Sequence, residues 1–367
     1  PEIPFPEAES RNIPEYYESP WPLSEQFYLV AYSPTPLVWE PGANRRDALG
    51  LYLLDRWNNR ELLYRDPDIG STNPCPLVPR PVPPVLASSL PSAELPTGEM
   101  LLLDVYEGLG DVPRGTIKEL RVVQIFPKTT NVANSPPIGM AGEENGRAVL
   151  GTVPVEADGS ARFLVPARTA VLFQALDADG LAYQTMRTLT YVQPGERISC
   201  VGCHENRRTA PPNAASLALR RPPSALSPGP YGGQPFSFVR VVQPVLDGHC
   251  VKCHSGKEPK KGIVLTGEPQ GAYTRSYATL MGGRGLVPRF AARNQIQVTA
   301  PGGPIGARGS RLLQMLRKGH NDVRLSPDDL RRLALWIDLN AIFYGVNLPA
   351  DQARQLRGEA LAMPHIQ

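Results

Sequence analysis

The chain has 367 residues, of which 41% are hydrophobic and 20% charged, a composition typical of a globular protein with two or three domains. Its net charge of +3 is too small to indicate a nucleic acid or a membrane surface as partner. No apolar run approaches the ~20 residues of a transmembrane helix, so no membrane-spanning segment is expected. The 41 prolines and 33 glycines predict many loops, with little helix in the first two thirds.

The first part of the chain predicts a small β-sheet. Residues 1–20 are polar and proline-rich and are expected to form an extended arm. Aromatic and branched residues then predict strands at 27–32, 50–55 and 60–65, the last two joined by an asparagine-rich turn. The pattern resembles one blade of a β-propeller, although the chain does not repeat it. The dense prolines of 74–97 predict an extended crossing to the next domain.

Residues 99–197 predict a second β domain. The runs 149–155 and 161–165 flank an Asp-Gly pair at 158–159, which is a strong hairpin signal. A further pair of strands is expected around the turn at 177–180. A β-sandwich of immunoglobulin-like size fits this pattern.

Helical patterns begin only after a proline-, alanine- and serine-rich linker. Residues 236–246 predict a helix that leads into a cysteine motif, and 309–318 predict another. The strongest helix has Ser326 as N-cap and Pro327 in its first turn, and its apolar face extends to Phe343. Helices before and after a cysteine motif are the layout of a small class I cytochrome c.

These elements predict a mainly β chain with a small α-helical domain. Residues 1–97 would hold the N-terminal arm, the propeller-like β remnant and the proline-rich crossing. Residues 98–232 would form the β-sandwich-like domain, ending in the first cysteine motif and a linker. Residues 233–367 would form the class I cytochrome c-like domain and a C-terminal tail.

Four of the five cysteines lie in two Cys-x-x-Cys-His motifs. The motifs are Cys200-Val-Gly-Cys203-His204 and Cys250-Val-Lys-Cys253-His254. This pattern is the attachment signature of c-type haem, in which two thiols bond to the porphyrin and the histidine binds the iron. We therefore predict two covalently bound haem c groups. The alternatives for each motif are a zinc half-site or a redox dithiol.

The haem motifs also bear on location. Because c-type haem is normally attached outside the cytoplasmic membrane, an exported protein is expected, either periplasmic or extracellular. The chain begins at Pro1 and shows no signal peptide, so it is expected to be a mature or truncated form. Only Cys75 remains outside the motifs, which leaves no disulfide within the chain.

Several phrases resemble the hydrazine synthase alpha-subunit family. They are Gly151-Thr-Val-Pro-Val-Glu-Ala-Asp-Gly-Ser160, Gln184-Thr-Met-Arg187, Pro194 to Arg207 around the first motif, Gln243-Pro-Val-Leu246 and Leu335-Trp-Ile-Asp-Leu-Asn-Ala341. The resemblance covers roughly residues 20 to 345. It implies the tail of a propeller, a middle domain with one c-haem and a C-terminal domain with a second.

The resemblance also implies ligands. It pairs His320 with His254 on the second iron, against the alternative of an exposed loop histidine. In hydrazine synthase the middle-domain iron resembles a catalytic site with a tyrosine ligand four residues after the motif histidine, but Arg208 stands at that position here. His204 is therefore expected to bind the first iron. A zinc ion shared by Cys75 and His204, as in the family's special site, is not expected without that tyrosine.

Other candidate ligands remain open at this point. Met315 and Met281 are alternatives to His320, while Met186, Met140 or an open face are the options for the first iron. The remaining cysteine, Cys75, would otherwise be a small buried hydrophobic residue. The arginines after the first motif, Arg207 and Arg208, are expected to pair with haem propionates or with acidic side chains. His249 is expected at the surface or at the haem edge, and His365 is given no role.

The function expected first is electron transfer by an exported dihaem c-type cytochrome, as a single protein or within a larger assembly. Its partners would be a redox protein, such as another cytochrome, or further copies of the chain, with no nucleic acid involved. The alternative is a haem oxidoreductase whose five-coordinate first haem acts on a small nitrogen or oxygen species, with electrons from the second haem. A third option is an adhesion protein with structural haems.

Overall fold

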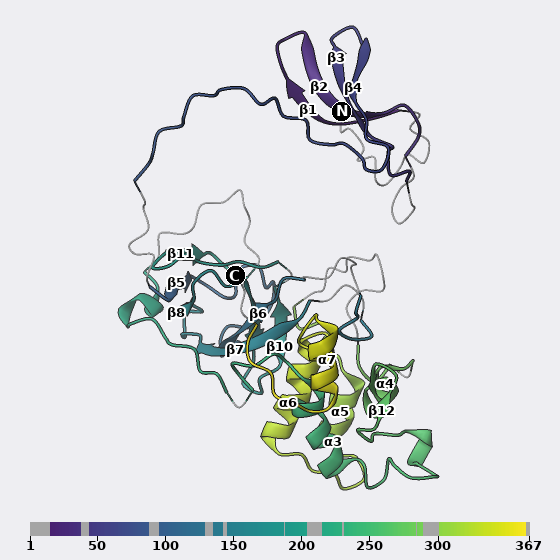
Figure 1. The fold of residues 1–367 in the computed structure, drawn as a ribbon. Coiled ribbons are helices and arrows are strands. Elements are labelled where there is room, and N and C mark those ends of the chain that lie inside the picture. The colour runs from purple at the N-terminus through teal and green to yellow at the C-terminus, as the bar shows by residue number, and fades with distance from the viewer. Residues whose placement is uncertain are drawn as a thin grey trace. The chain divides into compact units, whose positions relative to one another are not determined.

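The computed structural model describes residues 15–37, 44–87, 95–128, 135–141, 145–186, 188–203, 215–229, 231–283, 285–288 and 301–364. The chain divides into two compact units, residues 1–87 and residues 88–367. Most of the regular structure is β, and the helices lie in the last part of the sequence (Figure 1). The predicted mainly β class with a small helical part is confirmed. The predicted division of the second unit at residue 232 stays a prediction.

The first unit is one antiparallel four-stranded sheet in the order β1-β2-β3-β4. Its strands are β1 (Tyr16–Pro22), β2 (Phe27–Ser33), β3 (Gly50–Asp55) and β4 (Arg60–Tyr64). The three strands expected from the sequence are confirmed as β2, β3 and β4. The arm predicted for 1–20 is wrong at its end, because Tyr16 and Tyr17 pair with β2, and the Tyr17 ring lies 4.6 Å from the Tyr32 ring.

The second unit contains two sheets that share a core. One sheet has the order β10-β9-β6-β7 and the other β11-β5-β8. The strands are β5 (Thr97–Leu102), β6 (Glu119–Ile125), β7 (Arg147–Pro154), β8 (Ala161–Pro166), β9 (Val171–Leu176), β10 (Ala182–Thr185) and β11 (Arg197–Cys200). Buried side chains from both sheets form one cluster, in which the rings of Phe163 and Phe173 meet edge to face at 5.6 Å.

The predicted hairpin across 158–159 is wrong. Strand β7 pairs with β6, and β8 pairs with β5 in the other sheet. The turn, closed by the Glu156 N–H donating to the Ser160 carbonyl at 2.7 Å, carries the chain across the shared core. Strand β8 alternates buried and half-buried residues, and β7 alternates in the same way from Leu150 to Val153, because each has its inner face on that core. By contrast, the hairpin around 177–180 is confirmed, since β9 and β10 pair directly.

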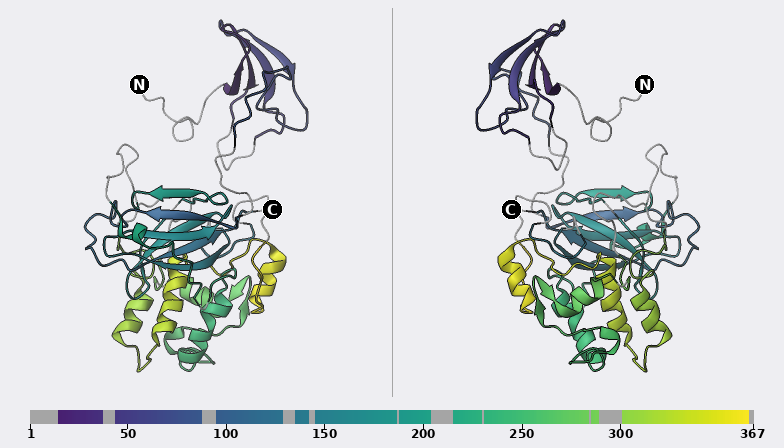
Figure 2. Two further views of the ribbon diagram at one scale, coloured as in Figure 1. Left: turned by 90° about the vertical axis from the view of Figure 1, so that its left-hand side faces the viewer. Right: turned by 90° about the vertical axis from the view of Figure 1, so that its right-hand side faces the viewer.

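The α-helices cover the other face of the β10-β9-β6-β7 sheet (Figure 2). They are α2 (Phe238–Val241), α3 (Gln243–His249), α4 (Arg275–Met281), α5 (Arg311–Lys318), α6 (Pro327–Asp338) and α7 (Pro349–Leu356). Of two short 3-10 helices, η1 (Leu217–Arg220) lies beside β8 of the other sheet and η2 (Lys260–Gly262) follows the second cysteine motif. A two-stranded ribbon, β12 (Pro269–Gln270) and β13 (Tyr273–Thr274), precedes α4. Val123 of β6 and Leu172 of β9 join the helical core, so the sheet is the middle of three layers.

Two of the three helices expected from the sequence are confirmed as α5 and α6, whereas the helix expected over 236–246 is divided into α2 and α3 at Val242, just before Pro244. Helix α6 begins where predicted, because the Ser326 side chain accepts from the Asp329 N–H and the Asp329 carboxylate accepts from the Ser326 N–H. The helix ends at Asp338, however, so Phe343 reaches the core from the segment after it. In the described part of the chain, no helix is long and apolar enough to cross a membrane.

A buried polar network ties α6 to the middle sheet. The Asp338 carboxylate accepts from the backbone N–H groups of Ala307, at 2.7 Å, and Ala182, at 2.9 Å. The Asp338 carbonyl accepts from Gln174 Nε2 of β9 at 2.7 Å, and the Arg121 guanidinium of β6 lies 3.9 Å from the carboxylate. The network therefore links the last turn of α6 to three strands and to the loop that holds Ala307.

Candidate haem-binding sites

The second motif starts at the end of helix α3. The Cys250 N–H still donates to the Leu246 carbonyl, at 2.8 Å, and the N–H groups of Cys253 and His254 both donate back to the Cys250 carbonyl. This single turn holds the two cysteines and the histidine close together, as attachment of one porphyrin requires. Cys250 is half-buried and Cys253 is exposed.

The ring of His254 is oriented by its own loop. The Nδ1 atom lies 3.3 Å from the Ile263 carbonyl oxygen, and because a carbonyl only accepts, Nδ1 carries the proton. The Nε2 atom therefore presents a lone pair. A backbone carbonyl on the second nitrogen is the usual way in which a metal-binding histidine is fixed.

His320 faces His254. Their ring centres are 6.2 Å apart and their planes differ by 13°. Two metal–nitrogen bonds of about 2 Å, with about 1 Å from each nitrogen to its ring centre, give about 6 Å between ring centres across one metal ion. The Nε2 atom of His320 accepts from the Asn321 side-chain amide at 3.3 Å, so binding of iron at this nitrogen would replace that hydrogen bond. The distance between the two ring centres therefore matches the spacing of two histidines on opposite sides of one metal ion.

A tight turn puts His320 in this place. The Val323 N–H donates to the His320 carbonyl at 2.9 Å, and Asn321 and Asp322 between them have φ values of 45° and 65°. Two consecutive left-handed residues define a type I′ turn, for which Asn and Asp are favoured. The Asn321-Asp322 pair therefore favours this turn, which fixes the loop with His320 between α5 and α6.

The other candidates near the second motif have different places. Met281 is fully buried in the helical core, and Met315 packs against that core. His249 lies with Nε2 3.2 Å from the Asp329 carboxylate at the start of α6, so its ring is held by that helix. His320 therefore remains the residue that faces His254.

The first motif lies on a strand and a turn instead of a helix. Cys200 is the last residue of β11, which pairs in parallel with β5, and the Cys203 N–H donates to the Glu107 carbonyl at 3.1 Å. Gly202 is required here, because a Cβ atom at this position would lie 2.4 Å from Glu107. His204, Arg207, Arg208 and His365 lie outside the described residues, so their predicted roles stay predictions.

Both cysteines of the first motif pack against the core shared by the two sheets. Burial raises the pKa of the Cys203 thiol to about 12, and it raises the pKa of the Cys250 thiol in the second motif to about 11. A redox dithiol works through a thiolate with a lowered pKa, so these environments do not favour that alternative.

The two methionines considered for the first iron have different places. Met186 packs against the helical core, whereas the Met140 side chain is exposed and only its backbone N–H donates to the Tyr277 hydroxyl of that core, at 2.9 Å. The thiols of Cys200 and Cys203 pack against the inter-sheet core instead. This placement favours an open sixth position over Met186.

Cys75 is exposed in the first unit, with Arg80 Nη2 3.0 Å from its sulfur. The expectation of a small buried residue is therefore wrong, because the surrounding segment is an extended, proline-rich run without a core of its own. Across the described ranges, no group of three or more His, Cys, Asp or Glu side chains is placed to hold a metal ion. The zinc site with His204 falls outside those ranges.

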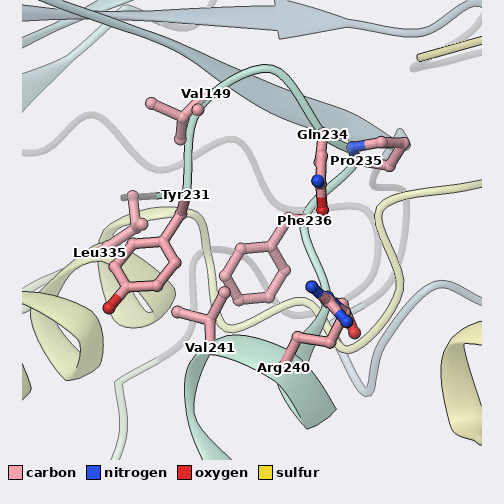
Figure 3. A pocket seen from close by; sticks show the side chains of 10 residues that line it. Val149, Tyr231, Gln234, Pro235, Phe236, Arg240, Val241 and Leu335 are labelled. Atoms are coloured by element: carbon pink, nitrogen blue, oxygen red, sulfur yellow. The ribbon is translucent and has the colours of Figure 1, made fainter. Parts of the chain in front are cut away.

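A small cavity lies between the middle sheet and the helices (Figure 3). Its volume is about 160 Å³, and its walls include Val149, Tyr231, Phe236, Val241 and Leu335. A cavity of about 150 Å³ holds a benzene-sized molecule, which is far smaller than a porphyrin. No motif residue lines it, so it is separate from both haem sites.

Comparison with known proteins supports the resemblance found in the sequence. Residues 115–205 match the family described as the hydrazine synthase alpha subunit middle domain. The hydrazine synthase subunit alpha of Kuenenia stuttgartiensis is 24% identical over 320 residues, covering 63% of this chain and 39% of that protein.

The solved structure of Kuenenia stuttgartiensis hydrazine synthase has a similar fold. It matches with a TM-score of 0.61 and 20% identity, covering 91% of this chain and 56% of that chain. The present chain therefore spans only about half the length of these relatives. By sequence in its middle region and by fold along most of its length, the chain resembles the hydrazine synthase alpha-subunit family.

Proposed function

We propose that the protein is a c-type cytochrome that binds two haems covalently and transfers electrons. The observation that carries this proposal is the facing pair of His254 and His320, 6.2 Å apart at their ring centres. When bound, haem supplies a one-electron couple at its iron, whose potential depends on the axial ligands and on exposure to water. The protein's part is to hold these axial ligands and to limit the exposure of the haem to water.

The second site is suited to electron transfer and not to binding a substrate. Cys250 and Cys253 would hold the porphyrin, and the two histidines would occupy both faces of the iron. The Ile263 carbonyl fixes one ring and the type I′ turn fixes the other. With both faces filled by side chains of the same chain, no position is left for a small molecule, and the ligand set changes little between oxidation states.

The first site would be held by Cys200, Cys203 and His204. An open sixth position there supports the second candidate function, a haem oxidoreductase acting on a small nitrogen or oxygen species. The specific observation in its favour is that Met186 packs against the helical core, whereas the thiols pack against the core between the sheets. In that case the second haem would supply electrons to the first.

We also propose a domain architecture and a cellular location for the protein. We take residues 1–97 as propeller-like, 98–232 as β-sandwich-like and 233–367 as cytochrome c-like. Strand β4 is an edge strand that exposes Leu62, Leu63 and Tyr64, which supports assembly with further β structure. Covalent haem attachment would place the protein outside the cytoplasm, with another redox protein as its partner.

Optical and EPR spectra of the purified oxidised and reduced protein, with and without carbon monoxide, test the proposal. The mass of the intact protein should first show the addition of two haems. Two low-spin haems without a carbon monoxide shift would support electron transfer alone. One high-spin haem that binds carbon monoxide would favour the oxidoreductase, with the first site as the reaction centre. A mass without added haem would refute both functions.

A further inference from the structure

The lysines of this chain are concentrated at the second motif. The chain has only seven lysines among 38 basic residues, and five of them lie beside the two facing histidines in sequence. We call these five the lysine rim: Lys252, Lys257, Lys260, Lys261 and Lys318. Four of them fall within the ten residues 252–261, where the acidic residue is Glu258.

The fold keeps the rim lysines near the motif and in water. The segment after His254 folds back, since the Lys260 N–H donates to the Cys253 carbonyl at 3.1 Å and the Leu265 N–H donates to the His254 carbonyl at 2.8 Å. All five rim lysines are exposed. Cys253, one of the two attachment thiols, is exposed among them.

The segment around His320 also carries positive charge. Lys318 ends helix α5 two residues before His320, and Arg324 follows the same turn, both exposed. Asp322, at the tip of the turn, is the exposed acidic residue of this loop. The facing histidines therefore lie between two segments that are both net positive.

Many arginines of the second unit form ion pairs within the fold, such as Arg162 with Glu99 at 2.7 Å and Arg354 with Glu359 at 2.9 Å. Arginine forms fixed, bidentate pairs, whereas lysine is a strongly hydrated charge on a flexible stem. Exposed lysines raise association rates without holding a partner tightly, which suits repeated, short encounters.

We propose that the lysine rim is the docking surface for an acidic redox protein, which exchanges electrons with the haem held by His254 and His320. This inference rests on the proposed function of the second site. Each encounter moves one electron, balanced by a one-electron change at the partner's redox centre, and no bond forms or breaks. A protein is favoured over a membrane or nucleic acid because the charge is confined to a redox site in a chain of net charge +3.

The test compares small redox reagents of opposite charge. The reduced holoprotein is oxidised by hexacyanoferrate(III), an anion, and by hexaammineruthenium(III), a cation, in stopped flow over a range of salt. The triple variant Lys257→Glu, Lys260→Glu, Lys261→Glu should react about tenfold more slowly with the anion at low salt, and faster with the cation. In about 1 M salt, where screening acts within about 3 Å, the difference should vanish.

A matched pair of single variants serves as the control. Lys260→Glu and Lys118→Glu make the same charge change at exposed sites, but Lys118 precedes β6, far from the motif in sequence. Only Lys260→Glu should change the salt dependence. A readout that does not depend on haem is the binding of a poly-glutamate peptide, followed by fluorescence anisotropy, which the triple variant should lose.

Three results would overturn the docking proposal. Unchanged rates in the triple variant, with low-spin spectra intact, would refute the docking surface and leave the proposed function standing. Binding to phosphatidylglycerol vesicles together with unchanged reagent rates would assign the rim to a membrane surface instead. Absence of a low-spin haem in the wild-type protein would refute the docking surface and the proposed function together.

Discussion

Removing the carboxylate of Asp338 should change how the stability of the protein depends on pH. This side chain is almost completely buried, and burial raises its pKa to about 6, against an ordinary value of 3.8. The charge of Arg121 and the N–H groups of Ala307 and Ala182 act in the opposite direction without offsetting the loss of water. The folded protein therefore holds a proton on Asp338 at pH values where the unfolded chain has lost it.

The sign and the size follow from linkage. Stability falls with pH wherever the folded state binds more protons than the unfolded state. The favourable contribution of Asp338 is thus complete below about pH 4 and is lost as the pH rises through about 6. The pKa difference of about two pH units, at about 1.4 kcal/mol per unit, corresponds to a loss of about 3 kcal/mol.

The assay is urea unfolding of wild type and Asp338→Asn between pH 4 and pH 7, followed by circular dichroism. All other acidic groups are the same in both proteins, so the wild type minus variant difference isolates Asp338. As the pH rises from 4 to 7, we expect the free energy of unfolding of the wild type to fall by about 3 kcal/mol relative to that of the variant. The lost N–H acceptor adds a constant offset of about 1–3 kcal/mol against the variant. A difference that stays constant, or that moves toward the wild type, would refute the reasoning.

Three further substitutions test the sites and the core. His320→Ala should convert the second haem from low spin to a form that binds carbon monoxide, whereas His249→Ala should leave it low spin; a low-spin spectrum in both would show that another residue is the ligand. Gly202→Ala should leave the protein one haem lighter by mass, because its Cβ has no room, whereas Gly248→Ala, with open space around it, should keep both haems. Trp336→Ala should lower the free energy of unfolding by about 3–5 kcal/mol in urea, and a loss below about 1 kcal/mol would contradict its place in the core.

Local sequence signals predicted those parts of the fold that depend on neighbours in the chain. Helix α6 was predictable because its capping box, its first-turn proline and its apolar face all lie within its own residues. The haem motifs were recognisable for the same reason, since attachment needs two thiols and a histidine in five consecutive residues. Strands β2 to β4 follow each other in space as in sequence, so their pattern was sufficient.

Features that depend on distant partners were not predictable in this way. An Asp-Gly turn reverses the chain, but it does not decide whether β8 returns to the sheet of β7 or crosses to another, and here β5 supplies the partner. Helices α4 and α7 are short and are stabilised mainly by the core on which they pack, so the sequence pattern missed them. The resemblance, and no spacing rule, singled out His320, which lies 66 positions after His254.

The middle sheet connects the two candidate sites. Val122 of β6 faces the core against which Cys200 and Cys203 pack, and Val123, after a bulge, faces the helical core that holds α3. Moving one motif relative to the other would therefore expose one of two well-packed cores and break the buried contacts of Asp338. Such a rearrangement would cost far more than the few kcal/mol that separate the states of a hinged protein. We therefore expect electrons to pass between the two sites at a fixed separation, with the rate controlled by docking at the lysine rim and not by movement within residues 88–367.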